Sequence, residues 1–224
     1  MKLRAEGIQK KFYRVHGDSN YFCAVDTLDF ELPEGRLTEI TGRSGSGKST
    51  LLNMLAGLLK PTAGRVLWDD TDIYALTDAK LSALRNRAVG VVPQGQTGLH
   101  SLTVLENVLL PSRLYGKGAP EAEAKKLLET VGIAELAQAR PGELSGGEMR
   151  RMAIARALIM KPGILLADEP TGDLDDENTG IVLRLLRGVA DTGTAVLLVT
   201  HEAEAAKYAD SVWRMNAGTL EPQV

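Results

Sequence analysis

Nine consecutive residues have the types and spacing needed to bind a polyphosphate. They fit the pattern G-x-x-x-x-G-K-[ST] of the phosphate-binding loop called Walker A, and they are Gly42, Arg43, Ser44, Gly45, Ser46, Gly47, Lys48, Ser49 and Thr50. Glycines let the backbone wrap closely around phosphates, because they carry no Cβ and tolerate positive φ angles. Successive N–H groups and the following helix N-terminus then face the anion. In such a loop we expect Lys48 to reach the β- and γ-phosphates and the Ser49 hydroxyl to bind Mg²⁺.

The sequence on either side of this loop has the pattern that the motif requires. Residues 37–41 resemble a strand leading in, and residues 49–58 have the apolar spacing of a helix leading out. The alternative is a glycine-rich turn that matches by chance, which is expected in roughly one chain per hundred of this length.

Two carboxylates follow another apolar run, residues 163–167. In parallel α/β sheets, ligands bind beyond the carboxyl ends of the strands, so we expect Asp168 and Glu169 beside the phosphate loop. Neighbouring strand residues point to opposite sides. We therefore predict that Asp168 belongs to the Mg²⁺ shell and that Glu169 is the general base for an attacking water. A surface acidic pair is the alternative, and it would be favoured if the phosphate loop were absent.

Two further polar residues are expected at the same sheet edge. Gln94 ends the predicted strand over residues 89–92, and its amide could contact the metal or the water. His201 follows the predicted strand over residues 194–200 and could touch the γ-phosphate. A lone histidine is more often structural than catalytic, and His201 differs only because of its place at a strand end.

Composition narrows the class of protein. The chain has 224 residues, of which 44% are hydrophobic and 25% charged, as in a soluble globular domain with or without an inserted subdomain. Its net charge of −3 gives no basic signature for nucleic acid. Cys23 is the only cysteine, which excludes an intrachain disulfide and suits a reducing compartment. No signal peptide or run of ~20 apolar residues is visible, so we expect another chain to supply any membrane-spanning part.

The elements that must position these residues alternate between strands and helices near both ends of the chain. We predict strands over residues 3–8, 25–32, 37–41, 65–68, 89–92, 163–167 and 194–200, and helices over residues 49–58, 78–87 and 178–190. Between them the pattern is helical: residues 103–106 and 145–148 each form a capping box, and residues 121–131 have helical spacing. Residues 94–160 are therefore predicted to be a helical insert in an α/β core.

Five residues of the N-terminal part have no assigned place in this scheme. Phe12, Tyr13, Tyr21 and Phe22 lie among the first strands, where they could pack in the core or one of them could stack on a nucleotide base. Glu39 has no explanation, because a central parallel strand is usually apolar throughout.

Six motifs occur in an order that resembles the ATP-binding cassette (ABC) ATPases along nearly the whole chain. They are the phosphate loop, Gln94, Leu144-Ser145-Gly146-Gly147-Glu148, Ala167-Asp168-Glu169-Pro170, Thr171-Gly172-Asp173-Leu174-Asp175 and His201. The resemblance implies a single ABC ATPase domain with a P-loop NTPase (RecA-like) α/β core. This core, residues 1–93 and 161–224, would have a mostly parallel sheet and an N-terminal antiparallel β subdomain. Residues 94–160 would be the inserted α-helical subdomain.

The resemblance also implies a dimer. In this family two cassettes enclose two ATP molecules, each held between the phosphate loop of one chain and the signature of the other. The signature here is Ser145, Gly146, Gly147 and Glu148, at a predicted helix start that offers N–H groups to an anion. By resemblance, Asp175 lies at the dimer seam. The adenine-stacking aromatic corresponds to Phe12, or to Tyr13 if the alignment slips by one residue.

A narrower resemblance is to the ATPases of the lipoprotein-release, macrolide-export and peptide-resistance group. It is carried by residues 61–64, 102–108, 154–158 and 171–175. Two segments depart from the group. Residues 93–96 lack the aromatics that usually flank Gln94, in a region that faces the membrane subunit in this family. Met149-Arg150-Arg151-Met152 replaces the usual glutamine-rich run after the signature.

The sequence thus predicts an ATP- and Mg²⁺-dependent ATPase subunit of an ABC transporter. Its expected partners are a second ATP-binding subunit, identical or a close paralogue, and an integral-membrane permease at the cytoplasmic face of the cell membrane. No nucleic acid is expected. The alternative is a non-transporting ABC ATPase that signals through a membrane partner. A DNA-repair or translation ATPase is disfavoured, because such relatives carry coiled-coil inserts or two fused cassettes, and the signature excludes a simple nucleotide kinase.

Overall fold

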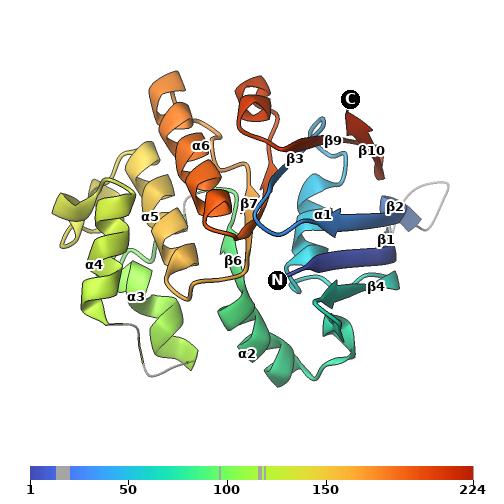
Figure 1. Ribbon diagram of the computed structural model, residues 1–224, viewed down its shortest axis with the longest axis horizontal. Coiled ribbons are helices and arrows are strands. Elements are labelled where there is room, and N and C mark those ends of the chain that lie inside the picture. Colours follow the sequence, from blue (N-terminus) through green and yellow to red (C-terminus); the bar gives the residue numbers. More distant parts are fainter. Residues whose placement is uncertain (14–20, 96, 116–117, 119, 224) are drawn as a thin grey trace.

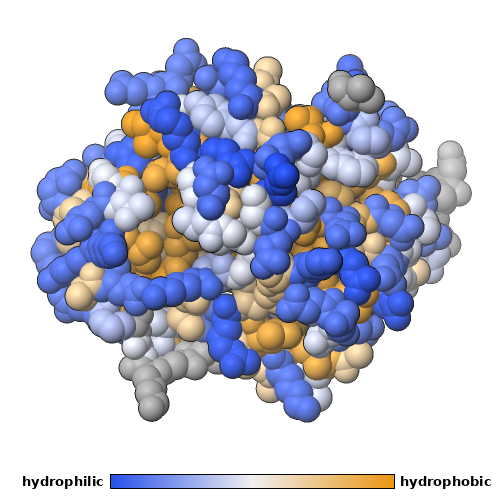
Figure 2. Space-filling view, in the orientation of Figure 1, coloured by the Kyte–Doolittle hydropathy of each residue, from blue (hydrophilic) through white to orange (hydrophobic). Residues whose placement is uncertain are grey.

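A computed structural model describes residues 1–13, 21–95, 97–115, 118 and 120–223; Gln96 of the predicted 93–96 motif lies outside them. Its strands form two sheets on one side of the molecule, and three helices, α3, α4 and α5, gather on the other (Figure 1). Seen from the same direction, the surface is largely hydrophilic, and hydrophobic residues emerge mainly in the recesses between elements (Figure 2).

The larger sheet carries the phosphate loop. Its strand order is β10-β9-β3-β8-β7-β6, and these strands are β3 (Leu37–Thr41), β6 (Val89–Val92), β7 (Ile164–Asp168), β8 (Ala195–Val199), β9 (Ser211–Asn216) and β10 (Thr219–Gln223). All neighbours are parallel except β9 and β10. The apolar runs of β7 and β8 are buried on both faces, as a parallel sheet covered by helices requires. The predicted mostly parallel core is confirmed.

The smaller sheet is antiparallel, as predicted for the N-terminal part. Its order is β2-β1-β4-β5, and its strands are β1 (Leu3–Tyr13), β2 (Tyr21–Leu32), β4 (Ala63–Trp68) and β5 (Thr71–Asp72). The first strand extends to Tyr13 instead of the expected residue 8, and the second begins at Tyr21 instead of the expected residue 25. They continue because Phe12 pairs with Phe22 and Tyr13 with Tyr21 across the ladder, and such aromatic pairs favour strand pairing.

Helix α1 (Lys48–Leu55) joins the two sheets into one core. Leu51 and Leu55 are fully buried in a cluster that also contains Leu3 from β1 and Leu197 from β8. The helix is shorter than the predicted 49–58, because Gly57 adopts a positive φ of 68° just after it.

The remaining helices follow the prediction closely. They are α2 (Asp78–Ala88), α3 (Val104–Tyr115), α4 (Glu121–Thr130), α5 (Gly146–Leu158) and α6 (Asp176–Asp191), with short 3₁₀ helices at Ile73–Ala75, Ala134–Leu136, Pro141–Glu143 and Ala203–Lys207. Both predicted capping boxes are confirmed: the Glu106 N–H donates to Thr103 Oγ1 over 3.2 Å, and the Glu148 N–H donates to Ser145 Oγ over 3.4 Å. Helices α3 to α5 lie between β6 and β7 in the chain and share a second apolar cluster with α6. Among the described residues, no helix has the length and apolarity to cross a bilayer.

Glu39 lies in the middle of β3, between β8 and β9, and none of its surface is exposed. Neither carboxylate oxygen has a hydrogen-bond partner among the described residues. Burial raises the pKa of Glu39 to about 7. A buried carboxyl group with a raised pKa therefore stands where the sheet would be expected to carry an apolar side chain.

Candidate active site

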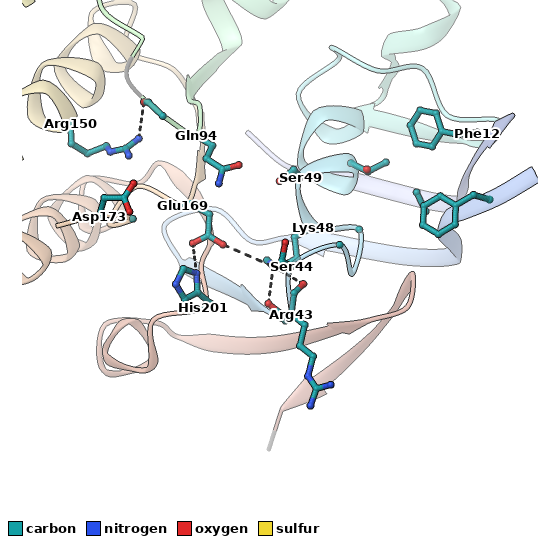
Figure 3. A pocket seen from close by; sticks show the side chains of 18 residues that line it. Phe12, Arg43, Ser44, Lys48, Ser49, Gln94, Arg150, Glu169, Asp173 and His201 are labelled. Carbon is teal, nitrogen blue, oxygen red and sulfur yellow. Dashed lines mark hydrogen bonds and ion pairs between the residues drawn. The ribbon is translucent and has the colours of Figure 1, made fainter. Parts of the chain in front are cut away.

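A cavity of about 840 Å³ opens at the carboxyl end of the parallel strands (Figure 3). The sequence-predicted site residues that line it are Phe12, Gly42, Arg43, Ser44, Gly45, Gly47, Lys48, Ser49, Thr50, Gln94, Glu169 and His201. Its size suits a nucleotide-sized ligand. Of the predicted phosphate loop, only Ser46 does not line the cavity; it is buried below the loop.

Two glycines are needed for the loop to fit against its neighbours. A Cβ on Gly42 would lie 2.3 Å from the Met215 carbonyl oxygen, and one on Gly47 would lie 2.2 Å from the Ala24 carbonyl oxygen. Gly47 is also the N-cap of α1, with φ 111° and no side-chain cap. The first N–H groups of α1 therefore have no capping side chain and face the cavity side of the loop.

Lys48 is the first residue of α1 and lies on the floor of the cavity. Its ammonium group donates to the carbonyl oxygens of Gly42, over 2.7 Å, and Arg43, over 3.1 Å. Only 7% of its side chain is exposed, so its ammonium group is held against the loop rather than in bulk water.

Asp168 ends β7 beside the start of α1 and is buried. Burial raises the pKa of this carboxyl, and the charge of Glu169 adds to the rise, whereas a hydrogen bond from Ser49 and the charge of Lys48 oppose it. Its Oδ1 atom has no hydrogen-bond partner within the described part of the chain. A buried carboxylate oxygen next to a hydroxyl is thus available to a further group.

Glu169 leaves the strand conformation, with a φ of 48°. Its Oε1 atom lies 4.0 Å from Lys48 Nζ, and its Oε2 atom lies 2.9 Å from His201 Nδ1 (Figure 3). Our reason for separating the two acids, strand alternation, was therefore wrong, because the regular strand ends at Asp168. Both carboxylates approach the first residues of α1, one beside Ser49 and the other beside Lys48.

His201 follows β8, and its ring is 64% exposed at the mouth of the site. The Glu169 N–H donates to the Val199 carbonyl oxygen over 2.8 Å, which fixes the turn after β7 to the end of β8. Acid and imidazole are held together by this pairing of neighbouring strand ends. That is the arrangement expected from the common edge of a parallel sheet.

The four aromatic side chains at the ends of β1 and β2 are between 38% and 67% exposed. The interpretation that they pack in the core is therefore wrong for each of them. Phe12 and Phe22 pair across the ladder, and both line the cavity. Tyr13 and Tyr21 instead form an edge-to-face pair with ring centroids 5.8 Å apart, and neither is among the lining residues. Of the two positions that the resemblance indicated for base stacking, Tyr13 is therefore not supported. Phe22, which the sequence left open as one of four aromatics that could stack on a base, lines the cavity as the ladder partner of Phe12.

The signature residues lie apart from this cavity. Ser145, Gly146, Gly147, Glu148 and Asp175 are all absent from its lining. Ser145 caps α5, and its N–H donates to Glu148 Oε2 over 2.7 Å.

Asp175 and the signature are connected through Asn178. Asp175 caps α6 by accepting from the Asn178 N–H over 2.8 Å. A Cβ on Gly147 would lie 2.3 Å from Asn178 Oδ1, and Arg151 Nη1 donates to the same atom over 3.0 Å. The starts of α5 and α6 are thus packed as one unit.

Arg150 and Asp173 are the charged lining residues that were not among the predicted site residues. They lie on the opposite side of the cavity from Phe12 in the view of Figure 3. Arg150 belongs to the Met-Arg-Arg-Met segment that departs from the glutamine-rich pattern, and that departure was the available signal. A second hollow, of about 270 Å³, lies near α2, α3 and α5, and Leu58, Arg85 and Arg156 are among its lining residues.

Comparison with known proteins gives three concordant findings. The family described as ABC transporter matches residues 25–172. The lipoprotein-releasing system ATP-binding protein LolD of Xanthomonas euvesicatoria pv. vesicatoria (strain 85-10) is 42% identical over 221 residues, covering 97% of this chain and 89% of that protein. The methionine import ATP-binding protein MetN of Rhizobium meliloti (strain 1021) is 43% identical over 205 residues, covering 90% and 57%. A solved ATP-binding cassette, dimeric in a post-hydrolysis state with ADP and Pi, has a TM-score of 0.89 and 32% identity, covering 98% of each chain.

Proposed function

Because this chain belongs to the ABC transporter family, as an ATP-binding and ATP-hydrolysing subunit, we propose that the 840 Å³ cavity is its ATPase site. The phosphate chain of ATP lies along the loop from Gly42 to Thr50, with Lys48 directed at the β- and γ-phosphates. The adenine lies at the other end, against Phe12 and Phe22. The face of an aromatic ring can stack on a base with little specificity. The two rings lie on neighbouring strands, where Phe12 pairs with Phe22.

The residues beside the loop fit a Mg²⁺ ion. This ion prefers oxygen ligands and is usually held by one or two carboxylates together with substrate phosphates. Asp168 offers a buried oxygen that lacks a partner among the described residues, and Ser49 offers a hydroxyl next to it. Ser49 and Gln94 both line the cavity, whereas Asp168 lies buried behind its lining, and Gln94 offers an amide oxygen. We assign these three residues to the metal, which supplies charge neutralisation on the phosphates when it is bound.

Glu169 is the general base in this proposal. It accepts the proton of the water that attacks the γ-phosphate, and His201 holds the carboxylate in place. The observation that carries this assignment is the position of the carboxylate in the cavity, between Lys48 Nζ at 4.0 Å and His201 Nδ1 at 2.9 Å. Its side chain is only 12% exposed, so it is shielded from bulk water on the side away from the substrate.

The complete site needs a second ATP-binding subunit. Ser145 to Glu148 and Asp175 are proposed to contact the nucleotide and the seam of a partner cassette, because they do not line the cavity of their own chain. The similar cassette in its post-hydrolysis state is dimeric. In this scheme residues 1–93 and 161–224 are the catalytic core, and residues 94–160 are a helical subdomain that carries the signature toward the partner.

The proposed membrane partner is a permease that holds the subunit at the cytoplasmic face of the cell membrane. The similar proteins are the ATP-binding members of a lipoprotein-releasing system and of a methionine import system, so ATP hydrolysis in this chain is proposed to drive movement through such a partner. Co-purification with a permease and ATP-dependent movement of its substrate would test this part. A permease complex that hydrolyses ATP without moving any substrate would favour a signalling role instead.

The general-base assignment is tested by Glu169→Gln beside Asp168→Asn. Glutamine keeps the shape of Glu169 but cannot take the proton, so kcat should fall ~10²–10⁴-fold while ATP binding persists. With ATP and Mg²⁺ the Glu169 variant should elute as a dimer in size-exclusion chromatography, because unhydrolysed ATP keeps two loops and two signatures together. The Asp168 variant should remain monomeric, because its own ATP site lacks the metal ligand.

Two results would contradict the proposal in different places. A Glu169→Gln protein with parent activity would remove Glu169 from the role of base. A variant that binds ATP, does not hydrolyse it and stays monomeric would contradict the two-chain site for the isolated subunit.

A further inference from the structure

Two arginines of helix α5 hold the loop that carries Gln94. Arg150 Nη1 donates to the carbonyl oxygens of Pro93, over 3.1 Å, and Gly95, over 3.2 Å. These two carbonyls bracket Gln94 in the chain. Six residues further along α5, Arg156 donates to Thr97 O and Thr97 Oγ1, both over 2.7 Å. The loop is therefore fastened to one helix on both sides of Gly95.

The two arginines face different hollows. Arg150 lines the ATPase cavity together with Gln94, whereas Arg156 lines the smaller hollow near α2 and α3. The dashed contact in Figure 3 joins the guanidinium of Arg150 to the loop beside Gln94. A shift of α5 would therefore displace the backbone on either side of Gln94 at the edge of the nucleotide cavity.

Arg150 is an unusual residue for this place. It is 8% exposed. Burial lowers the pKa of its guanidinium, and the charge of Asp173 opposes this shift. The hydrogen bonds described for its Nη1 atom are with the carbonyl oxygens of Pro93 and Gly95 rather than with a carboxylate. Its neighbours Met149 and Met152 are buried and apolar. A buried charge that is satisfied by carbonyl oxygens is costly compared with an apolar side chain of similar volume. Stability therefore does not explain its presence, whereas the positioning of the loop does.

We propose that Arg150 is a positioning residue for ATP hydrolysis: it ties the backbone on either side of Gln94 to the signature helix, so that the Gln94 side chain is set for catalysis only when α5 is in place. This inference rests on the proposed function, in which Gln94 contacts the metal or the attacking water. Since α5 begins at the signature, contact of a partner's nucleotide with Ser145 would be transmitted through one rigid helix to Gln94 of the same chain.

The test is a double-mutant cycle with Arg150→Met, Gln94→Ala and the double variant. Methionine keeps the apolar volume and removes the donors, so the protein should fold and bind ATP within about threefold of the parent. A misplaced group can cost on the order of 100-fold in rate, and we expect kcat of Arg150→Met to fall ~10- to 100-fold. If Arg150 acts through Gln94, the double variant should be no slower than Gln94→Ala alone.

Two further variants sharpen this test. Arg150→Lys should recover part of the rate, because a single nitrogen of Arg150 makes both carbonyl contacts and an ammonium group can also donate twice. Arg87→Met makes the same change at an exposed arginine of α2 and should keep the parent rate. Hydrogen exchange should quicken at Gln94 and Gly95 in Arg150→Met and remain unchanged in Arg87→Met.

The inference would be overturned if Arg150→Met kept the kcat of the parent. It would also be overturned if the losses of kcat in Arg150→Met and Gln94→Ala multiplied in the double variant. A parent rate in Gln94→Ala would instead contradict the role of Gln94 in the proposed function. In that case the exchange measurement decides separately whether Arg150 holds the loop, and unchanged exchange in Arg150→Met would overturn that as well.

Discussion

Helices α1 and α5 both have glycines at their N-termini, but only α5 has a side-chain cap for its first N–H groups. Helix α1 begins after Gly47 with no side-chain cap and no acidic residue in its first turn. Helix α5 begins after Ser145 with a complete capping box, and the Glu148 carboxylate lies within its first turn. The N-terminus of α1 is therefore open to an external anion, whereas the N-terminus of α5 already has the carboxylate of Glu148 beside it.

This difference explains why one chain should bind ATP without completing the ATPase site. At α1 the helix dipole, the loop N–H groups and Lys48 are proposed to act together on a phosphate. At α5 the hydrogen bond from the Ser145 backbone holds the pKa of Glu148 below its ordinary value, with a second bond from the Ser145 hydroxyl, so that the carboxylate stays ionised. The helix dipole is partly neutralised there, and a free phosphate gains little from it. In the proposed dimer, this surface instead contacts a nucleotide that is already bound to the partner chain.

The largest effect is expected at the start of α1. Lys48→Ala removes the charge that faces the phosphates, and losing such a charge-assisted contact typically costs ~1.5–3 kcal/mol, or roughly 10- to 150-fold in affinity. We expect ATPase activity to be lost and nucleotide affinity to fall within this range, as measured by titration calorimetry. Lys80→Ala, at an exposed lysine of α2, is the matched control. Parent turnover in Lys48→Ala would contradict the assignment of the phosphate loop.

A change at the start of α5 should separate binding from hydrolysis. Ser145→Arg introduces a bulky side chain where the partner's nucleotide is proposed to lie, so hydrolysis should be lost while the monomer binds ATP with nearly the parent affinity. Nucleotide titration at concentrations where the chain is monomeric measures this. If binding falls as far as in Lys48→Ala, Ser145 belongs to the site of its own chain, and the contrast between the two helix starts disappears.

The smallest effect concerns the charge of Glu148. Glutamine can still accept the capping hydrogen bonds, so Glu148→Gln removes the negative charge while keeping the shape. A charge at a helix N-terminus is typically worth ~0.3–1 kcal/mol. Because the folded pKa of Glu148 is lowered, this stability is present above the unfolded pKa of 4.5 and is lost as the pH falls through the folded pKa. Urea unfolding at pH 7 should show the loss in the variant, and parent and variant should converge at acidic pH. An equal difference in the free energy of unfolding at both pH values would show that the loss does not come from the charge of Glu148.

Local spacing was sufficient for most helices and strands and for both capping boxes, and six motifs in one order were sufficient for the family. The α/β core and the antiparallel N-terminal sheet then followed from the resemblance to that family. The likeness to LolD also confirms the predicted resemblance to the lipoprotein-release group. Three features of the site depend instead on contacts between distant segments. Glu169 takes a positive φ where the end of β7 is bonded to the end of β8. Phe22 joins the cavity through its ladder partner Phe12, and Arg150 through carbonyls more than fifty residues away.

Folding of this chain is coupled to the binding of a proton at Glu39. Its carboxyl has a pKa of about 7 in the folded chain against 4.5 as a free side chain, so the chain takes up a proton at this residue when it folds between those pH values. Stability should therefore fall as the pH rises from about 4.5 to 7, by up to about 3 kcal/mol from this group, and level off above. Glu39→Gln should remove that slope, which denaturant unfolding at pH 5 and pH 8 can measure, and an unchanged slope would place its source elsewhere. The strand that leads into the phosphate loop would then be a site where the acidity of the surrounding solution adjusts how firmly the loop is supported.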